Sequence, residues 1–185
     1  MTEWDITVDG GWTPFILACR SGSTELVKLI LDHSSDEQVE FNAHAAGTTG
    51  FRKACQKGNT DVVKLLLDRS ALKNIHMDVN HTNDLGQSPF MTACDNGHLQ
   101  TVKLLLEISD TRNIDLNTRD HNGNTAFMLA CNSKRMEVVK LLLSYSQTKN
   151  IELPMLNAIG GYSEDIRRLI QEQKLLNYAN PCAIM

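Results

Sequence analysis

One phrase of eleven residues occurs four times along the chain, and this repetition constrains the fold more than any other feature. The copies read WTPFILACRSG, TTGFRKACQKG, QSPFMTACDNG and NTAFMLACNSK. Each is followed by a second, apolar phrase: ELVKLIL, DVVKLLL, QTVKLLL or EVVKLLL. Successive cysteines of the first phrase are 36, 39 and 37 residues apart, and the Val-Lys pairs of the second phrase keep these intervals. Two markers with one period indicate a tandem repeat.

Both phrases have the periodicity of short amphipathic helices. In the first phrase, Phe15, Ala18 and Cys19 are spaced by three and four residues, so they share one helical face. Thr13 precedes Pro14, which is the order of an N-cap hydroxyl and a proline in the first helical position. A glycine such as Gly22 then supplies the left-handed residue that ends a short helix. A helix pair this short cannot bury its apolar face alone, so the units are predicted to stack on one another.

These phrases resemble the ankyrin repeat. The resemblance rests on the pattern G-x-T-P-apolar-x-x-A-[Ala/Cys]-x-x-G, on V-V-K-L-L-L and on a D-[V/L]-N finger, and it covers residues 9–172. It implies an all-α ankyrin-repeat solenoid of stacked helix-turn-helix units with β-turn fingers, comprising four repeats plus a degenerate C-terminal cap. The predicted boundaries are a lead-in at 1–8, repeats at about 9–43, 44–81, 82–118 and 119–150, a cap at 151–172 and a C-terminal tail at 173–185.

The sequence departs from the family pattern in several places. Its units exceed the usual ~33 residues, and the extra residues fall in the connection after the second helix. The second finger is one residue short, and Gly50 replaces the proline of the pattern, so this finger is expected to be the least regular. Lys134 replaces the helix-ending glycine in unit four. In the cap, Arg167 replaces the valine of the earlier copies, as a solvent-facing end of a solenoid requires.

The resemblance implies a non-catalytic protein-interaction module or adaptor. In the family, the finger tips and the exposed side of the first helix line a concave surface that binds partner proteins. Trp12, Met91 and Met128 are the strongest candidates there, because aromatic residues and Met are enriched at interfaces. The alternative is that Trp12 covers the open end of the stack and that the two methionines pack between helices. The full candidate set is Trp12, Arg20, Arg52, Gln56, Lys57, Asp84, Leu85, Gln87, Met91, Asp95, Asn96, His121, Asn122, Asn124, Met128 and Asn132.

The charges among these candidates change sign along the chain. Arg20, Arg52 and Lys57 lie in the first two units, whereas Asp84 and Asp95 lie in the third. A partner with a complementary change of charge would be oriented by it.

Composition and motifs disfavour other functions. The 18 Lys and Arg residues are outnumbered by 22 Asp and Glu and form no run in the sequence, so nucleic-acid binding is not expected. The repeated cysteines are interpreted as core thiols, because stacked helices ~8–10 Å apart cannot share a zinc ion through bonds of ~2.3 Å. Nucleophile-elbow, P-loop and dinucleotide-binding motifs are lacking, so no catalytic residue, metal or cofactor is predicted. With neither a signal peptide nor a membrane span in the sequence, we expect a cytoplasmic monomer with reduced cysteines.

The fifth cysteine is out of phase with the repeats. Cys182-Ala183-Ile184-Met185 matches the C-a-a-X pattern, in which a final Met favours farnesyl. It resembles the farnesylated tails of Ras-type GTPases and B-type lamins. We therefore expect a prenyltransferase to modify Cys182 and the protein to contact membranes reversibly, because one lipid chain anchors only marginally. The alternatives are a secreted microbial ankyrin effector that uses host prenylation, and a scaffold whose unmodified tail packs on the C-terminal helix.

Asn80 is a candidate for a second modification. Ankyrin repeats that resemble these can be hydroxylated by an oxygenase at the asparagine that starts a finger. Asn80, eight residues after Leu72, fits that pattern best.

Overall fold

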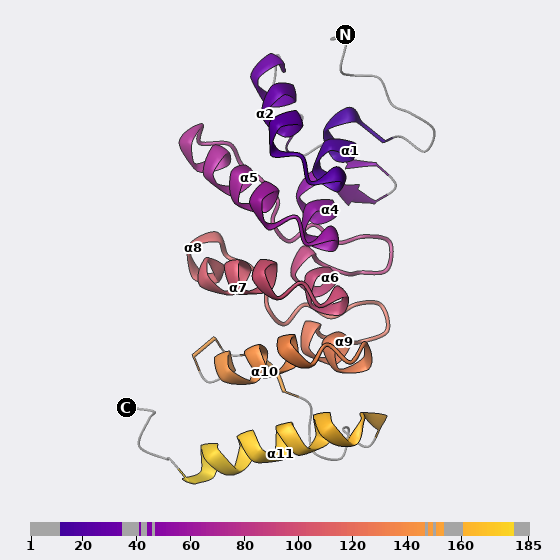
Figure 1. Ribbon diagram of the computed structural model, residues 1–185, viewed down its shortest axis with the longest axis vertical. Helices are drawn as coiled ribbons and strands as arrows, with labels where there is room; N and C mark the ends of the chain where they lie inside the picture. The colour runs from indigo at the N-terminus through magenta and orange to yellow at the C-terminus, as the bar shows by residue number, and fades with distance from the viewer. Residues whose placement is uncertain are drawn as a thin grey trace.

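Helices stack in pairs along one elongated row (Figure 1). The computed structural model describes residues 12–34, 41, 44–45, 47–146, 148–149, 151–153 and 161–179. The inner helices are α1 (Pro14–Ser21), α4 (Gly50–Lys57), α6 (Pro89–Asn96) and α9 (Ala126–Asn132), and each packs on the next. The outer helices are α2 (Thr24–His33), α5 (Thr60–Leu72), α7 (Leu99–Glu107) and α10 (Met136–Tyr145). The predicted all-α solenoid of stacked helix pairs is confirmed.

The inner helices begin as their sequences predict. The hydroxyl at each N-cap accepts a hydrogen bond from the backbone N–H three residues later, at 3.2–3.4 Å. The four capping residues are Thr13, Thr49, Ser88 and Thr125.

The inner helices also end as predicted, with left-handed residues. Gly22, Gly58 and Gly97 have φ values of 84°, 71° and 81°. In unit four Lys134 adopts the same conformation, with φ at 55°. It is held there because the N–H of Arg135 still donates to a carbonyl five residues back, at 2.8 Å, as in units two and three.

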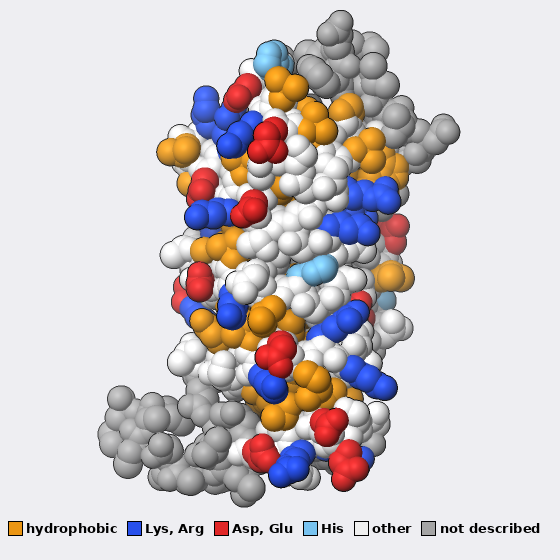
Figure 2. Space-filling model, viewed as in Figure 1, with side chains coloured by type: hydrophobic (Ala, Val, Ile, Leu, Met, Phe, Trp, Pro, Cys, Tyr) orange, Lys and Arg blue, Asp and Glu red, His pale blue; other side chains and the backbone are white. Residues whose placement is uncertain are grey.

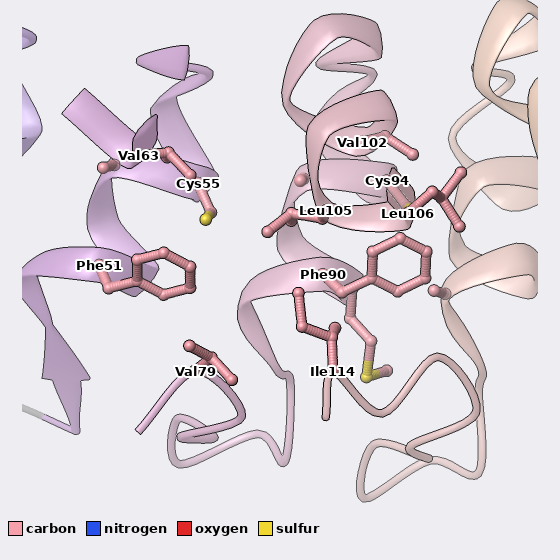
Figure 3. Close-up of a cluster of buried hydrophobic side chains, with 14 of the residues drawn as sticks. Phe51, Cys55, Val63, Val79, Phe90, Cys94, Val102, Leu105, Leu106 and Ile114 are labelled. Carbon is pink, nitrogen blue, oxygen red and sulfur yellow. The ribbon is translucent and has the colours of Figure 1, made fainter. Parts of the chain in front are cut away.

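The apolar faces of neighbouring units pack against each other to form one continuous core. Leu66, Leu105 and Leu142 are at most 1% exposed. Figure 3 shows Phe51 and Phe90 projecting from successive inner helices among the side chains of this core. The extended row therefore depends on contacts between units, as expected for a solenoid.

The four repeated cysteines are core thiols, as interpreted from the sequence. Each is at most 2% exposed. Burial raises the pKa of the Cys131 thiol to about 12, and burial likewise raises the pKa values of Cys55 and Cys94. The described residues include no group of three His, Cys, Asp or Glu side chains arranged to hold a metal ion.

Part of the extra length of the units is helical, which corrects the prediction that it lies in the connection after the second helix. α5 has 13 residues against 10 for α2. In unit three, α8 (Ser109–Arg112) adds a short helix directly after α7. Arg112 Nη2 donates to the carbonyl of Leu67 at 2.6 Å, so this insertion ties unit three to unit two.

The fingers project on the side of the inner helices (Figure 1). In finger two, β1 (His44–Ala45) pairs antiparallel with β2 (Thr48–Thr49). Finger three is instead a turn in which Asn83 Oδ1 accepts from the N–H of Gln87 at 2.8 Å, and Asp120 does the same for Asn124 in finger four. Finger two thus differs from the later two, in line with its shorter sequence.

The helix α11 (Glu164–Ala179) closes the stack against α10. Ile166 and Ile170 are fully buried, whereas Arg167 is exposed as predicted for a cap. The helix continues to Ala179, so the predicted boundary at residue 172 is too early; Asn177 and Tyr178, assigned to the tail, are helical. None of the described helices combines the length and the apolar character needed to cross a bilayer. Residues 154–160 and Cys182 lie outside the described residues.

Candidate functional site

The exposed side of the inner helices carries part of the candidate partner-binding set. On α4, Lys53, Gln56 and Lys57 follow i, i+3, i+4 spacing, and they lie about 200° around the helix from the buried face that includes Phe51. Lys57 is exposed, and Lys53 and Gln56 are half-buried. The equivalent position on α1 is held by the exposed Arg20. On the later helices this side bears three more candidates: half-buried Asp95, exposed Asn96 and exposed Asn132.

The candidates in fingers three and four lie next to each other. The N–H of His121 donates to the carbonyl of Leu85 at 3.0 Å, which joins the two fingers through their backbones. Leu85 is 57% exposed. Exposed side chains also occur at Asp84, His121 and Asn122, while Gln87 and Asn124 are half-buried.

Two candidates are not accessible, and their prediction as partner contacts is wrong. Met91 is fully buried and Arg52 is only 4% exposed. Both are one residue after the core phenylalanine of the helix, about 100° from it, and this flank is covered in the stack. The packing alternative therefore holds for Met91, which belongs to the core cluster. Met128, at the same position in unit four, is half-buried.

Trp12 is half-buried and forms the centre of a basic cluster. Arg20 Cζ lies 5.7 Å and Lys53 Nζ 4.8 Å from the centroid of the indole ring, so two cations from different units share one aromatic ring. Lys53 Nζ also donates to Gln56 Oε1 at 2.7 Å. We define the basic cluster as Arg20, Arg52, Lys53 and Lys57. Figure 2 shows basic side chains gathered at the edge of the stack over α1 and α4.

Comparison with known protein families identifies the family of this chain. The family described as ankyrin repeats (3 copies) matches the chain over two ranges, residues 2–77 and 70–155. The chain belongs to the ankyrin-repeat family. Ankyrin repeats bind partner proteins and are typically non-catalytic, so the exposed helix faces and fingers form the candidate interface. No curated protein sequence matches the chain significantly.

Two residues of the ankyrin surface are absent from the predicted partner-binding set. Leu17 and Lys53 are half-buried on the open side of α1 and α4. Their signal was the same helical spacing, since each lies three residues before a polar candidate, Arg20 or Gln56. The position before them, which holds Arg52 in unit two, also varies between units, so variation alone does not distinguish it from an exposed position.

Arg52 is a buried cation in the ankyrin stack. Its Nε and Nη1 atoms are buried, and neither has a hydrogen-bond partner among the described residues. Burial lowers the pKa of Arg52, and the nearby carboxylate of Asp84 partly offsets this effect. Because an arginine side chain stays charged at neutral pH, its positive charge acts from beneath the exposed surface.

Asn80 joins two ankyrin units. Its Nδ2 donates to the carbonyl of Asn113 at 2.7 Å, and its Oδ1 accepts from the N–H of Asp115 at 3.0 Å. Asn117 repeats part of this arrangement, since its Oδ1 accepts from the N–H of Glu152 at 2.8 Å. The asparagines at the finger starts therefore have a structural role, and hydroxylation of Asn80 stays a prediction.

Proposed function

We propose that this ankyrin protein is an adaptor that binds a partner protein on the face formed by the inner helices and the fingers, and that a farnesyl group on Cys182 attaches it reversibly to membranes. The carrying observation is the contrast between positions. The buried inner-helix positions repeat the same residues, such as Phe51 and Phe90. The equivalent positions on the open side, which are exposed or half-buried, change from Arg20 to Gln56 to Asp95 to Asn132. Stacking requires the first set, so the second set is free to fit one partner.

The binding face can be tested with two exposed leucines. Leu85 is 57% exposed on finger three, and Leu72 is 83% exposed at the end of the outer helix α5. Affinity capture from cells should recover at least about tenfold less partner with Leu85→Asp, because a charge there opposes burial of an apolar contact. Leu72→Asp introduces the same chemical change and should leave recovery within about twofold. Equal recovery with both variants would contradict binding at the fingers.

The lipid proposal rests on the CAIM sequence, whose Cys182 follows the last described helical residue, Ala179, by three positions. Intact-mass analysis of protein expressed in eukaryotic cells should show one farnesyl group, and Cys182→Ser should remove it together with membrane association. Met185→Leu should redirect modification toward geranylgeranyl, because the final residue selects the prenyl group. A parent protein without lipid would overturn this part and leave an adaptor with an unmodified tail.

A further inference from the structure

We infer that the basic cluster around Trp12 is the docking site for an acidic segment of the partner protein, bound across α1 and α4. This inference rests on the proposed function and specifies the chemistry of the partner. Neither α1 nor α4 contains an acidic residue. Together they carry the four cations Arg20, Arg52, Lys53 and Lys57. Opposite charge on the partner is the chemistry that such a surface favours.

Among the described residues, the carboxylate that acts on the cluster is that of Asp84, which partly offsets the effect of burial on the pKa of Arg52. Across the part of the chain that the structure describes, none of the four cations forms an ion pair with a carboxylate. Burial lowers the pKa of Lys53, and the charges of Arg52, Arg20 and Lys57 lower it further. These like charges lie close enough to Lys53 to disfavour its charged form. A bound carboxylate would relieve this repulsion.

Arg52 strengthens the field of the cluster without direct contact. It is only 4% exposed, and its Nε and Nη1 atoms are buried without partners in the part of the chain that the structure describes. A charge in such a low-dielectric position is screened less by water than an exposed one. It therefore adds to the attraction felt by an anion above Lys53 and Lys57.

Trp12 prepares the cluster for binding. The indole lies within 5.7 Å of the Arg20 guanidinium and 4.8 Å of the Lys53 ammonium, which restrains two otherwise flexible side chains. Restraint before binding lowers the entropy lost on association. Trp and Arg are also the residue types that most often dominate binding energy at interfaces. The half-buried ring thus offers an apolar contact between two charged ones.

The neighbouring unit limits where an acidic segment can lie. Asp84 is exposed in finger three, and Asp95 is half-buried on α6. Asp95 Oδ1 also accepts a hydrogen bond from the hydroxyl of Ser133. A flat anionic membrane that covered α1 and α4 would also meet these carboxylates, whereas a narrow peptide can avoid them. The change of charge within one helix spacing, ~10 Å, therefore favours a peptide over a lipid surface.

Fluorescence anisotropy with the full chain tests the inference. The probe is a labelled peptide of about ten residues in which Glu alternates with Ser, long enough at ~3.3 Å per residue to cross both helices. Lys53→Glu/Lys57→Glu should weaken its binding at least about tenfold. The matched control, Lys28→Glu/Lys64→Glu, makes the same charge change at exposed positions of α2 and α5 and should weaken it less than about threefold. Substituting Gln for every Glu of the peptide should abolish binding.

Four outcomes would overturn the inference. Equal weakening by the two variant pairs would indicate attraction to net charge alone, and binding of the Gln peptide would indicate that charge is irrelevant. Binding of phosphatidylserine vesicles, but not of the peptide, would identify the cluster as a membrane contact. Thermal unfolding of both pairs checks that each variant is folded. If Leu85→Asp lowers the amount of partner captured but Lys53→Glu/Lys57→Glu does not, the proposed adaptor function is supported and docking of an acidic segment on the basic cluster is rejected.

Discussion

Replacing Gly50 with proline is expected to lower the free energy of unfolding by about 1–3 kcal/mol, the usual cost of overpacking a core. A Cβ atom at this position would lie 2.6 Å from Cε1 of Phe15 and 3.0 Å from Sγ of Cys19. Phe15 is 1% exposed and Cys19 is fully buried, so neither side chain can swing into solvent. The substitution must therefore displace the packing between units one and two.

This expectation opposes the one that follows from the repeats alone. Pro14 and Pro89 hold the equivalent positions in units one and three. Proline is favoured at the first position of a helix, and replacing glycine usually reduces the entropy of the unfolded chain. Averaging over the repeats would therefore predict that Gly50→Pro stabilises the protein.

Urea unfolding followed by circular dichroism distinguishes these expectations. Gly50→Ala adds the same Cβ without the ring and should also destabilise, whereas Gly161→Ala adds a Cβ where no atom lies within 4 Å and should have little effect. Phe15→Leu should cost less in the Gly50→Ala background than in the parent, because the clash and the ring are coupled. A higher urea midpoint for Gly50→Pro would show that the packing adapts.

The sequence predicted the features that depend on the local backbone. The capping hydroxyl of Thr13 and the left-handed conformation of Gly22 were readable, because a helix end must satisfy its own backbone groups within a few residues. The left-handed conformation of Lys134 was not predicted, because the sequence shows there only the loss of the glycine. The stacked fold was readable too, since an apolar face that recurs in every unit must be buried by a neighbouring unit.

The exposed face was harder to predict because an inner helix of about eight residues has three faces in different environments, with only a few residues on each. One faces the outer helix, one flanks the next unit and one is open. The flanking position holds Ile16, Arg52, Met91 and Met128, and this mixture of polarity is what an exposed position would show. The contact between Trp12 and Lys53 was also inaccessible to local periodicity, because it joins residues 41 positions apart in different units. The extension of α5 to Leu72 depends on no contact between distant residues. It was not predicted because the residues after the second helical phrase were interpreted as a loop.

Arg52→Met is expected to raise the free energy of unfolding by about 1–4 kcal/mol, the range seen when buried ionic groups are replaced by apolar ones of similar size. The guanidinium is buried, and two of its nitrogen atoms have no partner within the described residues, so the folded state bears a desolvation cost that methionine would not. Met91 occupies the equivalent site in unit three and is fully buried, which shows that this repeat geometry accommodates the side chain.

The control for this variant is Lys57→Met, which removes a charge from the same helix at an exposed position and should change stability by less than about 0.5 kcal/mol. A loss of stability in Arg52→Met would contradict the argument and show that attraction to Asp84 outweighs desolvation.

The affinity of Arg52→Met for the acidic peptide is a second measurement on the same variant. If Arg52→Met is more stable than the parent yet binds the peptide more weakly, then the charge of Arg52 lowers the stability of the fold and raises its affinity for the peptide. If peptide affinity is unchanged, the field of Arg52 does not reach the surface.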